Sequence, residues 1–273
     1  MNTVTSVVKR YPLVTFFVLT YIFSWWGWLI DGVGQIPFGP LLAALIMVPL
    51  TGGVTGLKAW ASRIVRWRVG LKWYAVALLL PVAIVVAAVI LNVLLGAGAP
   101  SAGQLGAWPG IFPEFLFVFL IIGLGEEPGW RGYALPRLQE GRSVADPRTG
   151  ALLATLILAV FGVIWHLPLF ITGDSPWSNI PLIVAGYILF TWLFNNTNGS
   201  VLIAMLFHAS VGAVGPSFFA PMFSGADSVR YSWLLAALYC IVAVVVVILA
   251  RPARLARTPS VQVEAMAEPV AGV

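Results

Sequence analysis

Residues 121–133 read I-I-G-L-G-E-E-P-G-W-R-G-Y and place three ionisable side chains directly after an apolar run. The chain has only ten acidic residues in 273, yet Glu126 and Glu127 are adjacent here and Arg131 follows four positions later. Ionisable groups at membrane depth are costly, so they are retained mainly where they pair or carry out chemistry. The stretch therefore predicts a membrane-embedded helix that carries a functional site.

The composition indicates a membrane protein. Hydrophobic residues make up 60% of the chain and charged residues 9%, whereas a soluble domain carries about 25% charged residues. The twelve Trp and seven Tyr fit interfacial aromatic belts. The single cysteine, Cys240, excludes a disulfide framework and a cysteine-based metal cluster. The net charge of +5 is carried at segment ends, which favours membrane topology over nucleic-acid binding.

The apolar segments predict an all-α, polytopic membrane helix bundle. A spanning helix needs about 20 apolar residues. Eight candidate spans meet this length approximately: 12–30, 38–57, 73–96, 114–136, 153–173, 178–195, 200–220 and 232–250. We interpret residues 1–250 as one integral membrane domain and 251–273 as a disordered cytoplasmic tail, since the tail lacks apolar periodicity and contains three prolines.

The basic residues predict the orientation of the bundle. With both termini in the cytoplasm, all of the fifteen Lys and Arg except Arg230 lie on or near the cytoplasmic side. Residues 58–72 are interpreted either as a short interfacial helix or as a basic loop that contacts anionic lipids. Residues 97–113, rich in Gly and Pro, are expected to form an external loop.

The two adjacent glutamates are expected to have different tasks. Neighbouring helical residues point about 100° apart, and residues four apart share a face. Arg131 is therefore expected to neutralise Glu127, which leaves Glu126 facing the bundle interior as a candidate general base. A purely structural ion network is the alternative. Gly125 and Gly129 form a G-x-x-x-G pattern, which indicates close helix packing.

The only two histidines, His166 and His208, lie in later apolar segments. Counting about 1.5 Å per residue from the predicted cytoplasmic boundaries, both histidines and Glu126 lie in one layer, roughly 12–18 Å deep. Two interpretations stay open. Glu126 and both histidines could bind Zn²⁺ and a water molecule. Alternatively, Glu126 and His166 activate water without a metal, while His208 stabilises the oxyanion.

The ordered set E-E-x-x-x-R at Glu126–Arg131, W-H-L-P at Trp165–Pro168 and then His208 resembles the CAAX protease and bacteriocin-processing family of intramembrane endopeptidases, also called the Abi family. The resemblance covers about residues 114–215. It implies a membrane protease in which Glu126 activates water, His166 assists or co-ligates a metal, and His208 serves the oxyanion or the metal. It also implies that Glu127 and Arg131 support these groups.

Two positions depart from the family pattern. The second motif of the family usually reads F-x-x-x-H, whereas Gly162 stands four residues before His166. The third usually reads H-x-x-x-N or H-x-x-x-D, whereas Gly212 stands four residues after His208. Gly212 removes a polar side chain, and the loss of one oxyanion donor costs about a hundredfold or more in rate. Ser210 and Asn198 are the nearby polar residues that could compensate.

We therefore expect an intramembrane endopeptidase, with or without zinc, that cleaves a membrane-associated peptide or protein from within a bacterial cytoplasmic membrane. The rival hypotheses are a non-catalytic scaffold or bacteriocin-immunity protein that retains the fold, and a proton-coupled transporter in which Glu126 titrates. The expected partners are the lipid bilayer and the membrane-associated substrate, and no nucleic acid is expected. The sequence indicates neither the oligomeric state nor the identity of the substrate.

Overall fold

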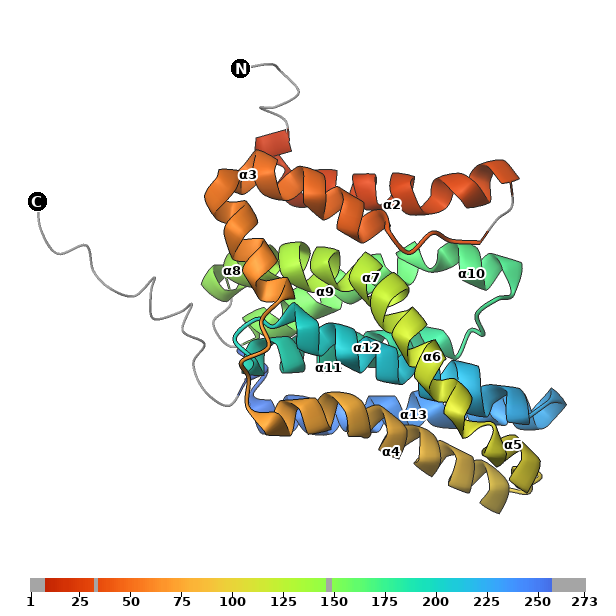
Figure 1. Cartoon of the computed structure of the whole chain (residues 1–273). Coiled ribbons are helices and arrows are strands. Elements are labelled where there is room, and N and C mark those ends of the chain that lie inside the picture. Colours follow the sequence, from red (N-terminus) through yellow and green to blue (C-terminus); the bar gives the residue numbers. More distant parts are fainter. Residues whose placement is uncertain (1–7, 32–33, 146–148, 257–273) are drawn as a thin grey trace, which may run out of the picture.

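The computed structural model describes residues 8–31, 34–145 and 149–256, and this part of the chain is helical without any β-strand (Figure 1). Its α-helices are α2 (Pro12–Asp31), α3 (Gly39–Ile64), α4 (Leu71–Leu94), α5 (Ala102–Gly106), α6 (Ile111–Phe117), α7 (Leu124–Gly129), α8 (Leu135–Ala145), α9 (Gly150–Trp165), α10 (Leu167–Thr172), α11 (Asn179–Asn196), α12 (Val201–Val214) and α13 (Gly225–Ala250). Some of these helices are joined by three π-helical segments, Val118–Gly123, Trp130–Ala134 and Gly215–Phe219, and by two 3₁₀ turns, Trp108–Gly110 and Ala220–Met222. The predicted all-α class is confirmed.

Six helical stretches within the described residues are long and apolar enough to cross a membrane. They correspond to six of the predicted spans: 12–30, 38–57, 73–96, 114–136, 200–220 and 232–250. The other two predicted spans, 153–173 and 178–195, contain α9 with α10 and α11. The count of eight spans and the cytoplasmic position of both termini stay predictions. The chain is a multi-pass membrane protein.

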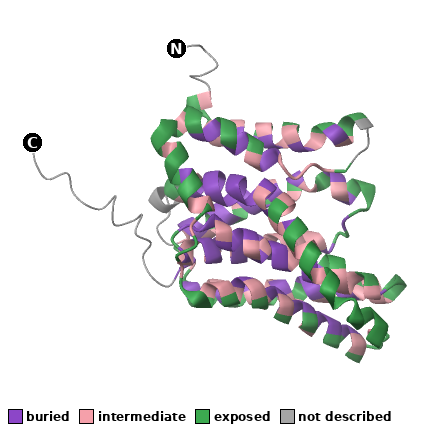
Figure 2. Ribbon diagram, viewed as in Figure 1, coloured by how far each residue is buried: buried purple, intermediate pink, exposed green. Residues whose placement is uncertain are grey.

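Two apolar clusters form the interior of the bundle. One joins the inner faces of α4, α11, α12 and α13, and the other joins α2, α3, α8 and α9. Buried residues concentrate along the centre of the bundle, whereas exposed residues cover its outer helices (Figure 2). Many of the exposed residues are large and apolar, for example Leu79, Val244 and Ile248. This pattern is expected where lipid instead of water surrounds the helices.

The segment with the two glutamates is a long helix interrupted by two π-helical stretches. Val118–Gly123 precedes α7 and Trp130–Ala134 follows it, so the turn with Glu126 and Glu127 lies between two distortions. Single π-turns inside α-helices are frequent at functional sites. Side chains of α3 bond to the backbone carbonyls here: Trp60 Nε1 donates to the carbonyl of Pro128 over 2.9 Å, and Arg63 Nη1 to that of Gly132 over 3.2 Å.

The G-x-x-x-G pattern lies where α7 packs against the start of α3. A Cβ atom at Gly125 would lie 2.8 Å from the carbonyl oxygen of Pro37, and one at Gly129 would lie 2.4 Å from that of Pro40. Real Cβ atoms essentially never make contacts this short, so only glycine allows the two backbones to approach. The close packing that this pattern predicts is therefore present.

Farther along, α3 kinks at Gly53, which has a φ of 59°.

The segments outside the predicted spans differ from their predictions. Residues 54–64 form the part of α3 that follows the kink at Gly53, and 65–70 is not helical, so 58–72 is partly helix and partly loop. The interfacial position of this helix stays a prediction. Within 97–113, predicted as an external loop, α5 forms behind a capping box of Ser101 and Gln104. The Ser101 hydroxyl and the Gln104 side chain satisfy backbone N–H groups there, a local signal for a helix start.

The beginning of the predicted disordered tail contacts the bundle. The carbonyl groups of Pro252 and Ala253 accept hydrogen bonds from the backbone N–H groups of Leu152 and Ala151 in the first turn of α9. Such N–H groups have no partner inside their own helix. Asn195 Nδ2 also donates to the carbonyl of Arg254 over 2.7 Å. The remainder of the predicted tail, residues 257–273, lies outside the described residues.

Replacement of Gly129 by alanine should destabilise the bundle. The new methyl group would meet the backbone of Pro40, which cannot rotate away as a side chain can. Overpacking of this kind costs about 1–3 kcal/mol. Thermal unfolding in detergent should therefore occur at a lower temperature for Gly129→Ala than for wild type. Gly56→Ala is the matched control, because its Cβ would have an ordinary contact of 3.7 Å; equal unfolding temperatures for both variants would refute the packing argument.

Candidate active site

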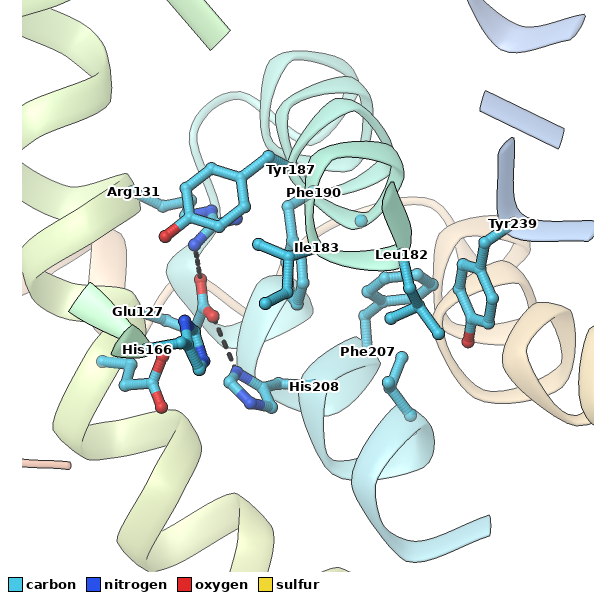
Figure 3. A pocket seen from close by; sticks show the side chains of 13 residues that line it. Glu127, Arg131, His166, Leu182, Ile183, Tyr187, Phe190, Phe207, His208 and Tyr239 are labelled. Carbon is cyan, nitrogen blue, oxygen red and sulfur yellow. Dashed lines mark hydrogen bonds and ion pairs between the residues drawn. The ribbon is translucent and has the colours of Figure 1, made fainter. Parts of the chain in front are cut away.

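One pocket contains all five residues selected from the sequence. Its volume is about 110 Å³, and it lies where the two apolar clusters meet, between α7, α9, α11, α12 and α13 (Figure 3). It is lined by Glu126, Glu127, Arg131, His166, Leu182, Ile183, Gly186, Tyr187, Phe190, Phe207, His208, Val211 and Tyr239. Residues from three separate helical segments are thereby brought together, as the predicted common layer requires.

Glu127 is the central group of the charged network. It is fully buried, its Oε2 lies 3.3 Å from Nη1 of Arg131, and its Oε1 lies 2.8 Å from Nδ1 of His208. The pairing of Glu127 with Arg131 is the one predicted from their spacing of four residues. The contact with His208, 81 positions away, had no local sequence signal. Glu127 thus links the α7 segment to α12.

Arg131 is also held by aromatic rings. Its guanidinium carbon lies 4.2 Å from the ring centroid of Tyr187 and 4.2 Å from that of Phe190, both on α11. Only 1% of Arg131 is exposed. A desolvated cation over two aromatic faces gains attraction from the ring quadrupoles. The arginine therefore joins α11 to the same network and keeps Glu127 in a fixed orientation.

His166 lies at a break between two helices and not inside one. His166 is both the C-cap of α9 and the N-cap of α10, whereas the sequence predicts a continuous helix over 153–173. Pro168, two residues later, cannot donate a backbone hydrogen bond, which explains the interruption. The Nδ1 of His166 lies 2.7 Å from the carbonyl oxygen of Gly162. Since a carbonyl only accepts, Nδ1 carries the proton.

The two histidines have the same arrangement of nitrogens. The Nδ1 of His208 faces the Glu127 carboxylate, which is also an acceptor, so this nitrogen carries a proton as well. In both rings Nε2 is the nitrogen left for chemistry. In a neutral His166 this nitrogen is a proton acceptor, whereas in a doubly protonated His208 it is a donor. With these protonation states, Nε2 of His166 can accept a hydrogen bond and Nε2 of His208 can donate one, so the two rings are suited to different roles.

Glu126 has surroundings different from those of Glu127. It is 7% exposed and lines the pocket, but neither of the ion pairs of Glu127 includes it. This agrees with the expectation that the two adjacent carboxylates point in different directions. Because Arg131 and His208 are both engaged by Glu127, the carboxylate of Glu126 is the one without a paired cation in this network.

Tyr187 was missed by the sequence analysis, and it explains the first departure from the family pattern. A Cβ atom at Gly162 would lie 2.2 Å from the hydroxyl oxygen of Tyr187. The tyrosine therefore occupies the space that any side chain at 162 would need. The carbonyl of this glycine holds His166, so Tyr187 packs directly against the support of a candidate catalytic residue. A lone tyrosine in an apolar helix gives no sequence signal for such a contact.

The second departure, Gly212, also has a packing explanation. A Cβ atom there would lie 2.9 Å from Cγ1 of Val118 in the first π-helical segment. Neither suggested replacement lines the pocket: the hydroxyl of Ser210 donates to the carbonyl of Leu78 on α4, and the backbone carbonyl of Asn198 accepts from Arg66 at one end of the bundle. Neither Ser210 nor Asn198 therefore supplies the polar side chain that Gly212 lacks.

The positions of the possible ligands bear on the metal interpretation. Across residues 8–31, 34–145 and 149–256, no three His, Cys, Asp or Glu side chains are grouped so that they could hold a metal ion. Glu127 is already bound to Arg131 and His208, which leaves Glu126, His166 and His208 as the conceivable set. As these side chains lie in the described residues, they do not form a group of metal ligands, and the choice between a zinc and a metal-free mechanism stays a prediction.

Comparison with known proteins supports the family resemblance. Residues 108–214 match the family of type II CAAX prenyl endopeptidase Rce1-like proteins. This match overlaps the predicted family region of 114–215 and contains α7, His166 and His208. Over 185 residues the chain is also 25% identical to the CAAX prenyl protease 2 of Methanococcus maripaludis. The alignment covers 62% of this chain and 65% of that protein, so the chain spans just under two thirds of its relative. The central region of the chain is therefore similar to the type II CAAX prenyl endopeptidase family.

Proposed function

We propose that this protein is an intramembrane endopeptidase in which Glu126 is the general base. The observation that carries the proposal is the shared pocket: an unpaired carboxylate faces the same small cavity as two histidines whose Nδ1 atoms are both fixed. General bases have to be within reach of the proton they remove, and fixed donors have to point at developing charge. The pocket offers both kinds of group, and the match of residues 108–214 to the type II CAAX prenyl endopeptidase family supports this assignment.

The proposed reaction needs only groups of this chain and water. Glu126 removes a proton from a water molecule, which His166 in the same pocket orients by accepting a hydrogen bond at Nε2. The water oxygen attacks the peptide carbonyl carbon, and the carbonyl becomes an oxyanion. The Nε2–H of doubly protonated His208 donates a hydrogen bond to that oxyanion. Protonated Glu126 then gives its proton to the leaving amine as the C–N bond breaks.

Glu127 and Arg131 are proposed to act as positioning residues. The negative charge of Glu127 lies 2.8 Å from Nδ1 of His208, so it favours the doubly protonated ring that donates at Nε2. Arg131 balances the second oxygen of Glu127 and is itself held by two rings. This division fits the different positions of the two adjacent glutamates.

The substrate class proposed is a membrane-associated peptide or protein segment. Apart from the charged groups, the pocket walls are mostly apolar, with Leu182, Ile183, Phe190, Phe207 and Val211 among them. An apolar pocket inside a membrane bundle suits a substrate that is already in or on the bilayer. The cell membrane is the proposed location. Prenylation is named in the description of the matched family and in that of the Methanococcus relative.

Glu126→Gln should abolish proteolysis while preserving the fold. Glutamine has nearly the same shape as glutamate but cannot take a proton from water, and loss of a general base lowers the rate by at least about a hundredfold. The measurement compares newly formed peptide termini across the host membrane proteome at equal expression. Glu114→Gln is the control, because Glu114 bonds to Ser217 away from this pocket.

Two results would contradict the assignment. Identical termini with wild type and Glu126→Gln, together with full rescue of a deletion phenotype by the mutant, would indicate a scaffold or immunity protein. Uptake driven by a pH gradient in reconstituted vesicles, without any peptide cleavage, would instead indicate a proton-coupled transporter.

Removal of metal should leave cleavage intact. Because the described acidic and histidine side chains form no group of three ligands, we expect purified protein to contain far less than one equivalent of zinc and to stay active after dialysis against a chelator. Elemental analysis of wild type, His166→Ala and His208→Ala checks this directly. About one equivalent of zinc in wild type, released in either variant together with activity, would overturn the metal-free mechanism.

A further inference from the structure

Tyr239 on α13 has a buried hydroxyl group without a hydrogen-bond partner. Only 1% of the residue is exposed, and its hydroxyl oxygen is unpaired among the described residues. The other buried positions on this face of α13 include Tyr231, Leu235, Ala236 and Ala243, so the surroundings are apolar apart from a second tyrosine. A phenol that is only needed for packing is better replaced by phenylalanine, because an unpaired buried hydroxyl is unfavourable. The hydroxyl at 239 therefore requires an explanation.

The side chain of Tyr239 lines the same pocket as Glu126 and the histidines. Figure 3 shows Glu127, His166 and His208 together on one side and Tyr239 on the other, with Leu182 and Phe207 between them. The pocket thus has a charged end, an apolar middle and a single hydroxyl at the opposite end. A ligand that extends from the charged end along the apolar wall reaches this hydroxyl.

We propose that Tyr239 is a substrate-binding residue whose hydroxyl donates a hydrogen bond to a backbone carbonyl of the bound peptide, away from the scissile bond. This inference rests on the proposed protease function and adds a specific binding contact to it. A peptide must leave its helical form before it can be cleaved, and its carbonyl groups then lack partners in a water-poor site. The hydroxyl of Tyr239 satisfies one of them.

A backbone carbonyl fits the site better than a substrate side chain. Figure 3 places Leu182 and Phe207 next to Tyr239, and both side chains are apolar, so they do not recognise a particular polar side chain. A backbone contact is independent of substrate sequence. Loss of this hydroxyl is therefore expected to weaken the binding of all substrates to a similar extent.

Tyr231 supplies a matched control on the same helix. It is 2% exposed, and its hydroxyl is also unpaired among the described residues, but it does not line the pocket. Tyr231→Phe and Tyr239→Phe each remove one buried oxygen from α13 and leave the ring in place. A difference between the two variants reports on the pocket and not on the packing of the helix.

The first test measures cleavage. For each wild-type-specific terminus, Tyr239→Phe should lower the initial rate at low substrate concentration about threefold to tenfold, the effect of one neutral hydrogen bond. With a peptide that contains one of these cleavage sites, the change should appear in KM with kcat nearly unchanged. Tyr231→Phe should match wild type. Equal rates for wild type and Tyr239→Phe, equal losses in both tyrosine variants, or losses confined to a few substrates would overturn the proposal.

The second test measures binding without catalysis. A fluorescent, leucine- and alanine-rich peptide of twelve residues is titrated against Glu126→Gln protein in detergent, alone and combined with each tyrosine change. The Kd should rise about threefold to tenfold with Tyr239→Phe and stay constant with Tyr231→Phe. An unchanged Kd, or no binding by any variant, would overturn the role of Tyr239. Because this assay needs no cleavage, failure of the protease function is seen separately, as identical termini with wild type and Glu126→Gln.

Discussion

The buried carboxylate of Glu127 is the constraint on which the site depends. A charge inside a membrane bundle is stable only when it is paired and hydrogen-bonded. Glu127 meets this requirement with Arg131 on its own helical segment and His208 on α12. The same pairing fixes the direction of the His208 ring, while the rings of Tyr187 and Phe190 hold Arg131 from α11. One electrostatic requirement therefore aligns three helical segments around the pocket.

The backbone around Glu127 is adapted to bring these groups together. The π-helical turns on both sides of α7 change the helical phase, which alters the direction of the side chains that follow. Gly125 and Gly129 let α3 approach until its backbone touches that of α7. The indole of Trp60 then bonds to the carbonyl of Pro128. Small residues, distorted turns and donors from a neighbouring helix thus work together at one place.

Sequence reasoning succeeded where the determining contacts are local. Apolar segment length predicted the helices, and the spacing of four residues predicted the ion pair of Glu127 with Arg131. It failed where a contact joins distant parts of the chain: the bond of His208 to Glu127, the position of Tyr187 against Gly162, and the hydroxyl of Tyr239 in the pocket. The helix break at His166 is an intermediate case, since Pro168 is a local signal whose effect within an apolar segment depends on its neighbours.

The two departures from the family pattern are consequences of packing. At Gly162 the missing side chain leaves space for the hydroxyl of Tyr187, and at Gly212 the space belongs to Val118. Restoring a larger residue at either position would require a second change in its neighbour, so each glycine and its partner form a coupled pair. The charged network does not include either glycine. Gly162 and Gly212 do not line the pocket either, so the two departures alter the packing behind the site and leave in place the groups that the proposed mechanism uses.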